Sequence, residues 1–203
     1  RRIQREIRIL STMNHPNVVH LQQLYQMGKY HIGLEFPFFS KNLRDILYEE
    51  IDSELFDNLV MDILSGVGYI HSQKIVHRDI KPENILIEDR RHHDGSIRCV
   101  LTDFGISKEE ISGTNNQTRF TTNAGAGTFN YMSPEVMRGD HGSYASDIYS
   151  IGILLFELLG GNVKDAGKAH SGSEIVDLIS GPISEGMKSL ILDLLEDNPM
   201  DRP

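Results

Sequence analysis

The sequence predicts an α+β fold, in which one helix and a strand pair come before a mainly helical body. Three observations indicate this class: two short apolar runs near the start separated by a turn, longer stretches with apolar residues at helical spacing, and a pair of short β-branched runs in mid-chain. A chain of 203 residues is long enough to bury a core in one or two domains.

The first elements follow from spacing and from breakers. Apolar residues at helical spacing predict a helix over residues 1–12, and Pro16 ends it. The next two apolar runs, 18–25 and 30–36, are separated by a turn at Gly28. We therefore expect an antiparallel strand pair.

A helical body makes up the rest of the chain. Asp52 is a suitable N-cap for a long helix whose wide apolar stripe faces a core. Residues 144–159 are apolar almost all round, which predicts a central helix. Residues 105–130 are rich in Thr, Ser, Asn and Gly and predict a mobile loop. The remaining expected elements are a helix at 42–48, strands at 85–88 and 97–102, and helices at 174–179 and 184–195.

Composition narrows the partners and the compartment. The formal net charge of −9 argues against a nucleic-acid or acidic-membrane surface. The single cysteine, Cys99, allows no internal disulfide and fits a reducing, cytoplasmic location, with the nucleus left open. The longest apolar run, 148–159, is too short to cross a bilayer and contains Glu157, so no membrane segment is expected. The sequence does not predict an oligomeric state.

Two short motifs carry the chemistry. Residues 77–85 read His-Arg-Asp-Ile-Lys-Pro-Glu-Asn-Ile, and residues 103–105 read Asp-Phe-Gly, with Asp103 24 residues after Asp79. An aspartate near a lysine is by itself usually a surface ion pair. Together, however, the motifs supply two carboxylates, an ammonium and an amide at the spacing that phosphoryl transfer needs. This joint pattern resembles the catalytic and metal-binding loops of eukaryotic serine/threonine protein kinases.

The resemblance implies ATP and Mg²⁺ as cofactors and a protein with a Ser or Thr acceptor as substrate. Asp79 would accept or orient the proton of the attacking hydroxyl, and Lys81 would offset the charge of the transferring phosphate. Asn84 and Asp103 offer the hard oxygen ligands that Mg²⁺ prefers, so both would bind the metal and the nucleotide. Thr128 would contact Asp79 and Lys81.

The same resemblance assigns the adenine contacts. Leu34 would be the gatekeeper, and the carbonyl of Glu35 would accept from the adenine amino group. Pro37 falls where most kinases donate a backbone N–H, which proline lacks, unless the alignment is one residue out. Leu86 would pack under the adenine ring, and Glu6 would pair with the ATP-binding lysine.

Further residues would be structural. Glu135 ends a segment that resembles the substrate-docking loop, and it would pair with Arg202. Asp147, in the expected central helix, would fix the backbone of the catalytic loop, since a buried carboxylate needs hydrogen-bond donors. His77 and Phe104 match the stacked spine that links the two lobes of a kinase.

Regulation by phosphorylation is also implied, because an arginine precedes the catalytic aspartate. Thr121 and Thr122 are the candidate acceptors in the activation segment, and cations around the phosphate would order it. The cations expected to surround it are Arg78, Lys108, Arg2 and Arg5. Glu83, beside the catalytic loop, would favour a basic residue upstream of the target hydroxyl.

The resemblance covers the whole chain and divides it at residue 36. Residues 1–36 match part of a kinase N-lobe, truncated to one helix and a strand pair, and residues 37–203 match a mainly helical C-lobe. No glycine-rich phosphate loop and no strand with the ATP lysine are found, so we expect a fragment that is inactive alone. A pseudokinase acting as a scaffold is the alternative function. A small-molecule phosphotransferase would leave 127–135 and Arg202 unexplained.

Overall fold

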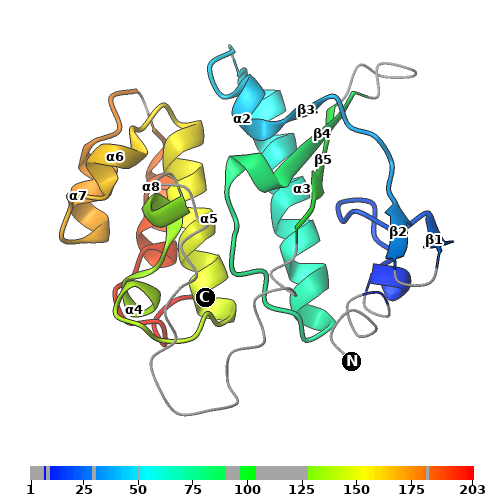
Figure 1. Ribbon diagram of the computed structural model, residues 1–203. Coiled ribbons are helices and arrows are strands. Elements are labelled where there is room, and N and C mark those ends of the chain that lie inside the picture. The colour runs from blue at the N-terminus through cyan, green and yellow to red at the C-terminus, as the bar shows by residue number, and fades with distance from the viewer. Residues whose placement is uncertain are drawn as a thin grey trace. The chain divides into compact units, whose positions relative to one another are not determined.

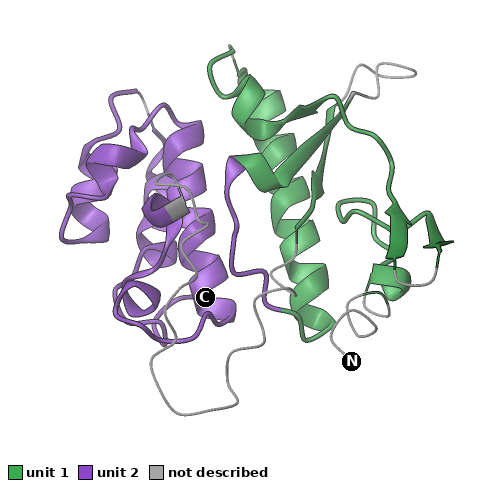
Figure 2. Ribbon diagram, viewed as in Figure 1, with its two compact units in different colours: residues 1–75, 83–107 green, residues 76–82, 108–203 purple. Residues whose placement is uncertain are grey.

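The computed structural model of the chain describes residues 7, 10–28, 31–49, 51–89, 97–103, 128–181 and 183–203. The chain forms two compact units, residues 1–75 with 83–107 and residues 76–82 with 108–203 (Figure 2). Helices and two small sheets make up the described part, so the predicted α+β class is confirmed. The predicted lobe boundary after residue 36 differs from these bounds. It rests on the family resemblance and stays a prediction.

The predicted strand pair is present in the first unit. Strand β1 (Gln23–Met27) pairs along its whole length with antiparallel β2 (His31–Glu35) (Figure 1). The first strand begins five residues later than predicted, because residues 18 and 19 pair with a different part of the unit. Val18 forms a parallel bridge to Leu101, and the N–H of Val19 donates to the Leu101 carbonyl at 2.9 Å.

A second, antiparallel sheet has the order β3-β4-β5. It consists of β3 (Lys41–Asn42), β4 (Ile85–Asp89) and β5 (Ile97–Leu101), with helix α2 (Leu43–Ile46) directly after β3 and the 3₁₀ helix η1 (Pro82–Asn84) directly before β4. Strands β4 and β5 and helix α2 match the sequence prediction. Strand β3 was not predicted, because two residues carry no periodicity.

Helix α3 (Ser53–Ser72) is the long helix of the first unit and packs on β5. The predicted cap is confirmed, since the Asp52 side chain accepts the N–H of Leu55 at 2.8 Å. Asp62, in mid-helix, accepts the N–H of Cys99 at 2.8 Å and so ties the helix to the strand. The buried part of its apolar stripe is Leu59, Val60, Ile63, Val67 and Ile70.

Asn17 fastens the segment before β1 to the same sheet. Its side-chain amide donates to the Cys99 carbonyl at 3.0 Å, and its own carbonyl accepts the N–H of Leu101 at 2.9 Å. Gly66 of α3 faces this segment, and a Cβ there would lie only 2.6 Å from the Asn17 carbonyl oxygen. A glycine at this position therefore allows the helix to approach the loop closely.

The second unit is built around α5 (Tyr144–Leu158), the predicted central helix. Residues 150–156 are all buried, as expected for a helix that is apolar on every side. The short helices before and after it carry little sequence signal, and α4 and α6 were not predicted. The elements around α5 are η3 (Thr128–Tyr131), α4 (Pro134–Met137), α6 (Val163–Ala166), α7 (Gly172–Asp177) and α8 (Glu185–Leu194).

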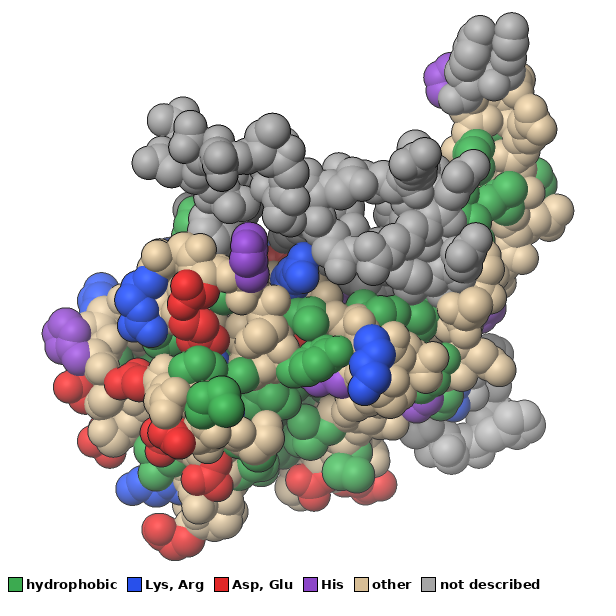
Figure 3. Space-filling model, turned by 90° about the horizontal axis from the view of Figure 1, so that it is seen from below, with side chains coloured by type: hydrophobic (Ala, Val, Ile, Leu, Met, Phe, Trp, Pro, Cys, Tyr) green, Lys and Arg blue, Asp and Glu red, His purple; other side chains and the backbone are tan. Residues whose placement is uncertain are grey.

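Among the described residues, no helix is both long enough and apolar enough to cross a membrane. On the face drawn in Figure 3, Lys and Arg side chains stand among acidic and neutral ones. This mixture matches a chain with 29 acidic and 20 basic residues.

Candidate active site

Asp147 anchors the predicted catalytic loop. It lies in the first turn of α5 and is 1% exposed. Its Oδ2 accepts the N–H of His77 and its Oδ1 accepts the N–H of Arg78, each at 2.8 Å. Hydrogen bonds to a buried carboxylate are among the strong ones. The prediction that Asp147 binds the catalytic-loop backbone is therefore confirmed.

The backbone is strained at two of the predicted site residues. Among the described non-glycine residues, only Lys74, Arg78 and Asp103 have positive φ, with 70° at Arg78 and 55° at Asp103. This left-handed region is unfavourable for residues with a Cβ, and the surrounding structure must hold them there. At Arg78 the bond to Asp147 does so.

Asp79 and Lys81 form a close ion pair on this loop. The Lys81 ammonium lies 2.9 Å from Oδ2 of Asp79, and the two side chains are only 17% and 8% exposed. The Asp79 N–H donates to Nδ1 of His77 at 3.2 Å, which further fixes the loop. The pair places a proton acceptor beside a cation that can neutralise a phosphate.

Asn84 and Asp103 lie at one end of the β4–β5 hairpin. Ile85 is opposite Leu101 in the strand register, Asn84 directly precedes this pair, and Asp103 follows it by two residues. The N–H of Thr102 donates to the Asn84 carbonyl at 3.0 Å, which continues the pairing beyond the strands. The two predicted metal ligands are thus brought to the same end of one hairpin.

The donor set at this hairpin end fits Mg²⁺. Asn84 offers an amide oxygen and Asp103 an exposed carboxylate, both hard oxygen ligands. In the part of the chain that the structure describes, no group of three or more His, Cys, Asp or Glu side chains could hold a metal. An ion here would take its other ligands from phosphate and water, as Mg²⁺ usually does. Asp79 and Lys81 belong to the other unit, so convergence of the four residues stays a prediction.

Glu135 and Arg202 form the expected ion pair in the second unit. Nη1 of Arg202 lies 2.7 Å from Oε1 of Glu135 and Nη2 lies 2.9 Å from Oε2, with the side chains 0% and 7% exposed. Burial raises the pKa of Glu135, but the hydrogen bonds from Arg202 and from the backbone outweigh it and hold the pKa below its ordinary value. Burial also raises the pKa of Tyr149, whose ring lies 5.0 Å from the guanidinium, to about 12.

Comparison with known proteins identifies the family. The sequence profile of the protein kinase domain matches residues 1–203. The chain belongs to the protein kinase family. It is 33% identical over 219 residues to serine/threonine-protein kinase pkn3 of Myxococcus xanthus. This match covers 100% of this chain and 39% of that protein. It is 32% identical to ribosomal protein S6 kinase alpha-1 of Homo sapiens (96% of this chain, 26% of the relative) and 35% identical to serine/threonine-protein kinase PrkC of Bacillus subtilis (83% and 25%).

Two of these relatives are named serine/threonine-protein kinases and the third is named a kinase, so the predicted enzyme class and fold are confirmed for this kinase domain. The chain spans less than half the length of each of the three.

The predicted adenine contacts of the kinase domain are placed in the first unit. Leu34 lies in β2 and is 37% exposed, and Leu86 lies in β4 and is half-buried. The Glu35 carbonyl accepts the N–H of Gln22 at 2.8 Å, which leaves its second lone pair for a nucleotide. Pro37 follows β2 by two residues and donates no N–H.

Several predicted residues lie outside the described part of the kinase domain. They are Arg2, Arg5, Glu6, Phe104, Lys108, Thr121 and Thr122. For Thr128 only the backbone is described, within η3.

Arg78, by contrast, is described. Its Nε is buried without a hydrogen-bond partner among the described residues.

Three contacts of the kinase domain were not predicted. Tyr131, 3% exposed in η3, donates its hydroxyl to the Glu157 carboxylate of α5, and Ser150 donates to the Tyr131 carbonyl at 2.8 Å. A carboxylate in an otherwise apolar run was the available signal, because it needs a partner when buried. Glu83 pairs with Arg44, 39 residues away, a contact that no motif encodes.

Proposed function

We propose that the protein containing this kinase domain transfers the γ-phosphoryl group of ATP to a Ser or Thr hydroxyl of a protein substrate. The observation that carries the proposal is the double hydrogen bond from the catalytic-loop backbone to Asp147, at 2.8 Å each. It holds the loop bearing Asp79 and Lys81 against the central helix before any substrate binds. Catalysis of phosphoryl transfer depends mainly on such positioning.

The side chains then have distinct tasks. The substrate hydroxyl oxygen forms a bond to the γ-phosphorus while the bond from that phosphorus to the β,γ-bridging oxygen breaks, and ADP leaves. Asp79 accepts the hydroxyl proton, and Lys81 turns toward the phosphoryl oxygens to offset their charge. The two groups lie 2.9 Å apart, so the proton acceptor and the cation stand side by side on the loop.

Asn84 and Asp103 would hold Mg²⁺ together with the phosphates of ATP. The ion would neutralise phosphate charge when bound. The hydrogen bond from Thr102 to the Asn84 carbonyl keeps the two ligands at one end of the hairpin. Removing the Asp103 carboxylate or the Asn84 amide oxygen should therefore weaken binding of ATP with Mg²⁺. Leu34, Leu86 and the Glu35 carbonyl would contact the adenine.

Phosphorylation of the activation segment would raise activity. The buried Nε of Arg78, without a hydrogen-bond partner among the described residues, supports an anion site at this arginine. Lys108, Arg2 and Arg5 would complete the site around a phosphate on Thr121 or Thr122. Alanine at both threonines with no change in turnover would count against this. The single, buried cysteine supports a reducing, cytoplasmic compartment.

The test is transfer of labelled phosphate from ATP with Mg²⁺ to protein, measured on the complete gene product. Asp79→Asn should lower kcat by about 100-fold or more, because the proton acceptor is lost. Asp177→Asn, the same change at an exposed site in α7, should leave kcat within about twofold of the wild type.

The scaffold alternative predicts a different result. A wild-type protein that binds ATP but transfers no phosphate to itself or to any protein would overturn the proposal and favour the pseudokinase. Transfer that is unaffected by Asp79→Asn would overturn the assigned mechanism.

A further inference from the structure

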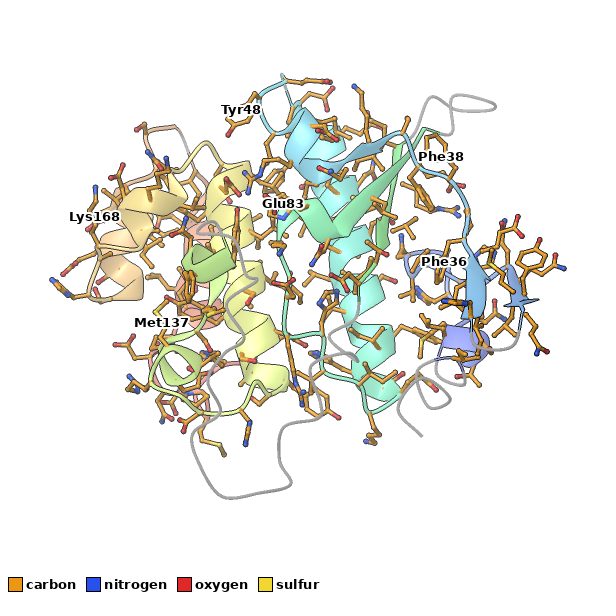
Figure 4. The ribbon with its side chains drawn as sticks, in the orientation of Figure 1. Phe36, Phe38, Tyr48, Glu83, Met137 and Lys168 are labelled. Atoms are coloured by element: carbon orange, nitrogen blue, oxygen red, sulfur yellow. The ribbon has the colours of Figure 1, made fainter. Side chains whose placement is uncertain are left out.

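Glu83 stands beside the catalytic loop but is already engaged. It lies in η1, four residues after Asp79 (Figure 4). Its Oε1 accepts from Nε of Arg44 in α2 at 3.0 Å, and the Arg44 and Glu83 side chains are 25% and 45% exposed. An acidic side chain that would attract basic substrates therefore has a resident cation.

The sheet register explains why these two side chains meet. Asn42 of β3 is opposite Leu86 of β4. From this point the chain turns into α2, so Arg44 follows two residues later, and Glu83 precedes Leu86 by three residues. The Asp45 carboxylate accepts the Asn42 N–H at 2.9 Å and fixes the start of the helix. The register of β3 against β4 therefore brings Arg44 and Glu83 close together.

Distance along the chain places Glu83 within reach of a bound substrate. Four residues span at most about 14 Å, so the carboxylate lies within a few substrate residues of a hydroxyl held at Asp79. A substrate arginine or lysine would meet a carboxylate whose charge the Arg44 guanidinium already offsets. The guanidinium would also repel the second cation, so the net gain from the contact would be small.

We infer that Arg44 removes the preference for basic substrates that Glu83 would otherwise give this kinase. This inference rests on the proposed function and specifies its substrate class: sequences with a neutral residue at the position that faces Glu83. It replaces the expectation, drawn from Glu83 alone, of a basic residue upstream of the acceptor. Arg44 is thus a specificity-determining residue that acts through its partner.

The test is a positional peptide scan with the complete protein. Each peptide carries one serine acceptor and one variable position, occupied by Arg, Gln or Glu, from five residues before the serine to five after. In the wild type, kcat/KM for Arg and Gln should agree within about twofold at the position that faces Glu83, which is the position where Arg44→Gln changes the ratio. Arg44→Gln should raise the Arg/Gln ratio about two- to fivefold at one position, the range expected for one partly exposed ion pair.

Two further variants separate this role from a structural one. Glu83→Gln removes the carboxylate from this pair and makes the local charge more positive, so the Glu/Gln ratio should rise at the same position, and the double variant should return both ratios to near one. The change should fall on KM and not on kcat, because the contact is made equally in ground and transition states. The control is Arg98→Gln, which breaks the 3.7 Å pair with Glu88 elsewhere in the same unit and should leave every ratio unchanged.

The outcomes distinguish the inference from the function beneath it. A wild type that phosphorylates the peptides, with an Arg/Gln ratio unchanged in Arg44→Gln, overturns the inference alone. A strong arginine preference in the wild type at the position that faces Glu83 overturns it as well. If only proteins are phosphorylated, the same ratios are read from the phosphosites of a cell-protein mixture. A wild type that phosphorylates nothing overturns the proposed function and this inference with it.

Discussion

The buried pair of Glu135 and Arg202 ties the segment after the activation region to the end of the described chain. The two residues are 67 positions apart, and their side chains are almost fully shielded from water. We predict that Arg202→Met destabilises the protein severely. The substitution replaces the guanidinium by an unbranched apolar side chain and leaves a buried carboxylate without its cation.

The magnitude follows from the partners left behind. Breaking a buried ion pair by removing one member costs about 3–5 kcal/mol. In Glu135→Met, Arg202 keeps backbone carbonyl acceptors from Glu196, Ala145 and Asp197, at 2.7, 2.9 and 3.3 Å. In Arg202→Met, Glu135 loses both of its bonds to the guanidinium. Arg202→Met should therefore be the more damaging single change, and the double variant should be less unstable than the sum of the two.

Thermal unfolding followed by circular dichroism measures the effect. For a chain of this size, about 3–5 kcal/mol corresponds to a Tm lower by roughly 6–20 °C. The control is Lys41→Met, which breaks the exposed pair with Glu49, at 3.0 Å with side chains 51% and 58% exposed, and should lower Tm by less than about 4 °C. Equal Tm values for Arg202→Met and Lys41→Met would refute the reasoning that burial makes this pair strong.

Three other predictions test the packing and the electrostatics. Asp147→Asn should lower kcat at least about tenfold, because the amide can accept only one of the two catalytic-loop N–H groups; unchanged phosphate transfer would contradict this. Gly66→Ala should lower the free energy of unfolding by about 1–3 kcal/mol, since its Cβ would lie 2.6 Å from a backbone oxygen, whereas Gly68→Ala, with open space in the same helix, should raise it by about 0.5–1 kcal/mol in denaturant titrations. Burial raises the pKa of Glu135, but hydrogen bonds from Arg202 hold it below 4.5, so its stabilisation exists above that pH and disappears on acidification. The stability gap between wild type and Glu135→Gln should then narrow as pH falls below about 4.5, and a gap that widens would contradict the assigned sign.

The fold could be predicted where one segment carries its own signal. Helix α3 has a capping aspartate and a wide apolar stripe, and α5 is apolar on every side, so the start of α3 and both ends of α5 were located within a residue. Strand β3 and helix α6 could not be located, because two and four residues are too few to show a period. The late start of β1 depends on Val18 bridging to Leu101, a pairing across 83 positions that local spacing does not record.

The candidate site could likewise be predicted where a local motif carries the signal. Motif spacing identified the candidate catalytic and metal-binding residues, whose roles stay predictions, and the rule that a buried carboxylate needs donors identified the partners of Asp147. The ion pair between Arg44 and Glu83 was not predictable, because it depends on the register of β3 against β4. The sequence therefore drew attention to the acidic residue beside the catalytic loop, but did not show the arginine that pairs with it.

The positive φ angles at Arg78 and Asp103 carry the argument one step further. Glycine would adopt this backbone conformation without strain, whereas a residue with a side chain costs about 1–3 kcal/mol there, which the surrounding structure has to offset. At Arg78 the cost is met by the bond to Asp147, and at Asp103 the preceding residue, Thr102, is held by the Asn84 carbonyl at 3.0 Å. In each case a hydrogen bond at or next to the strained residue keeps the backbone in place. Both predicted ligand-binding segments are therefore shaped before a nucleotide arrives, which reduces the ordering that binding has to supply.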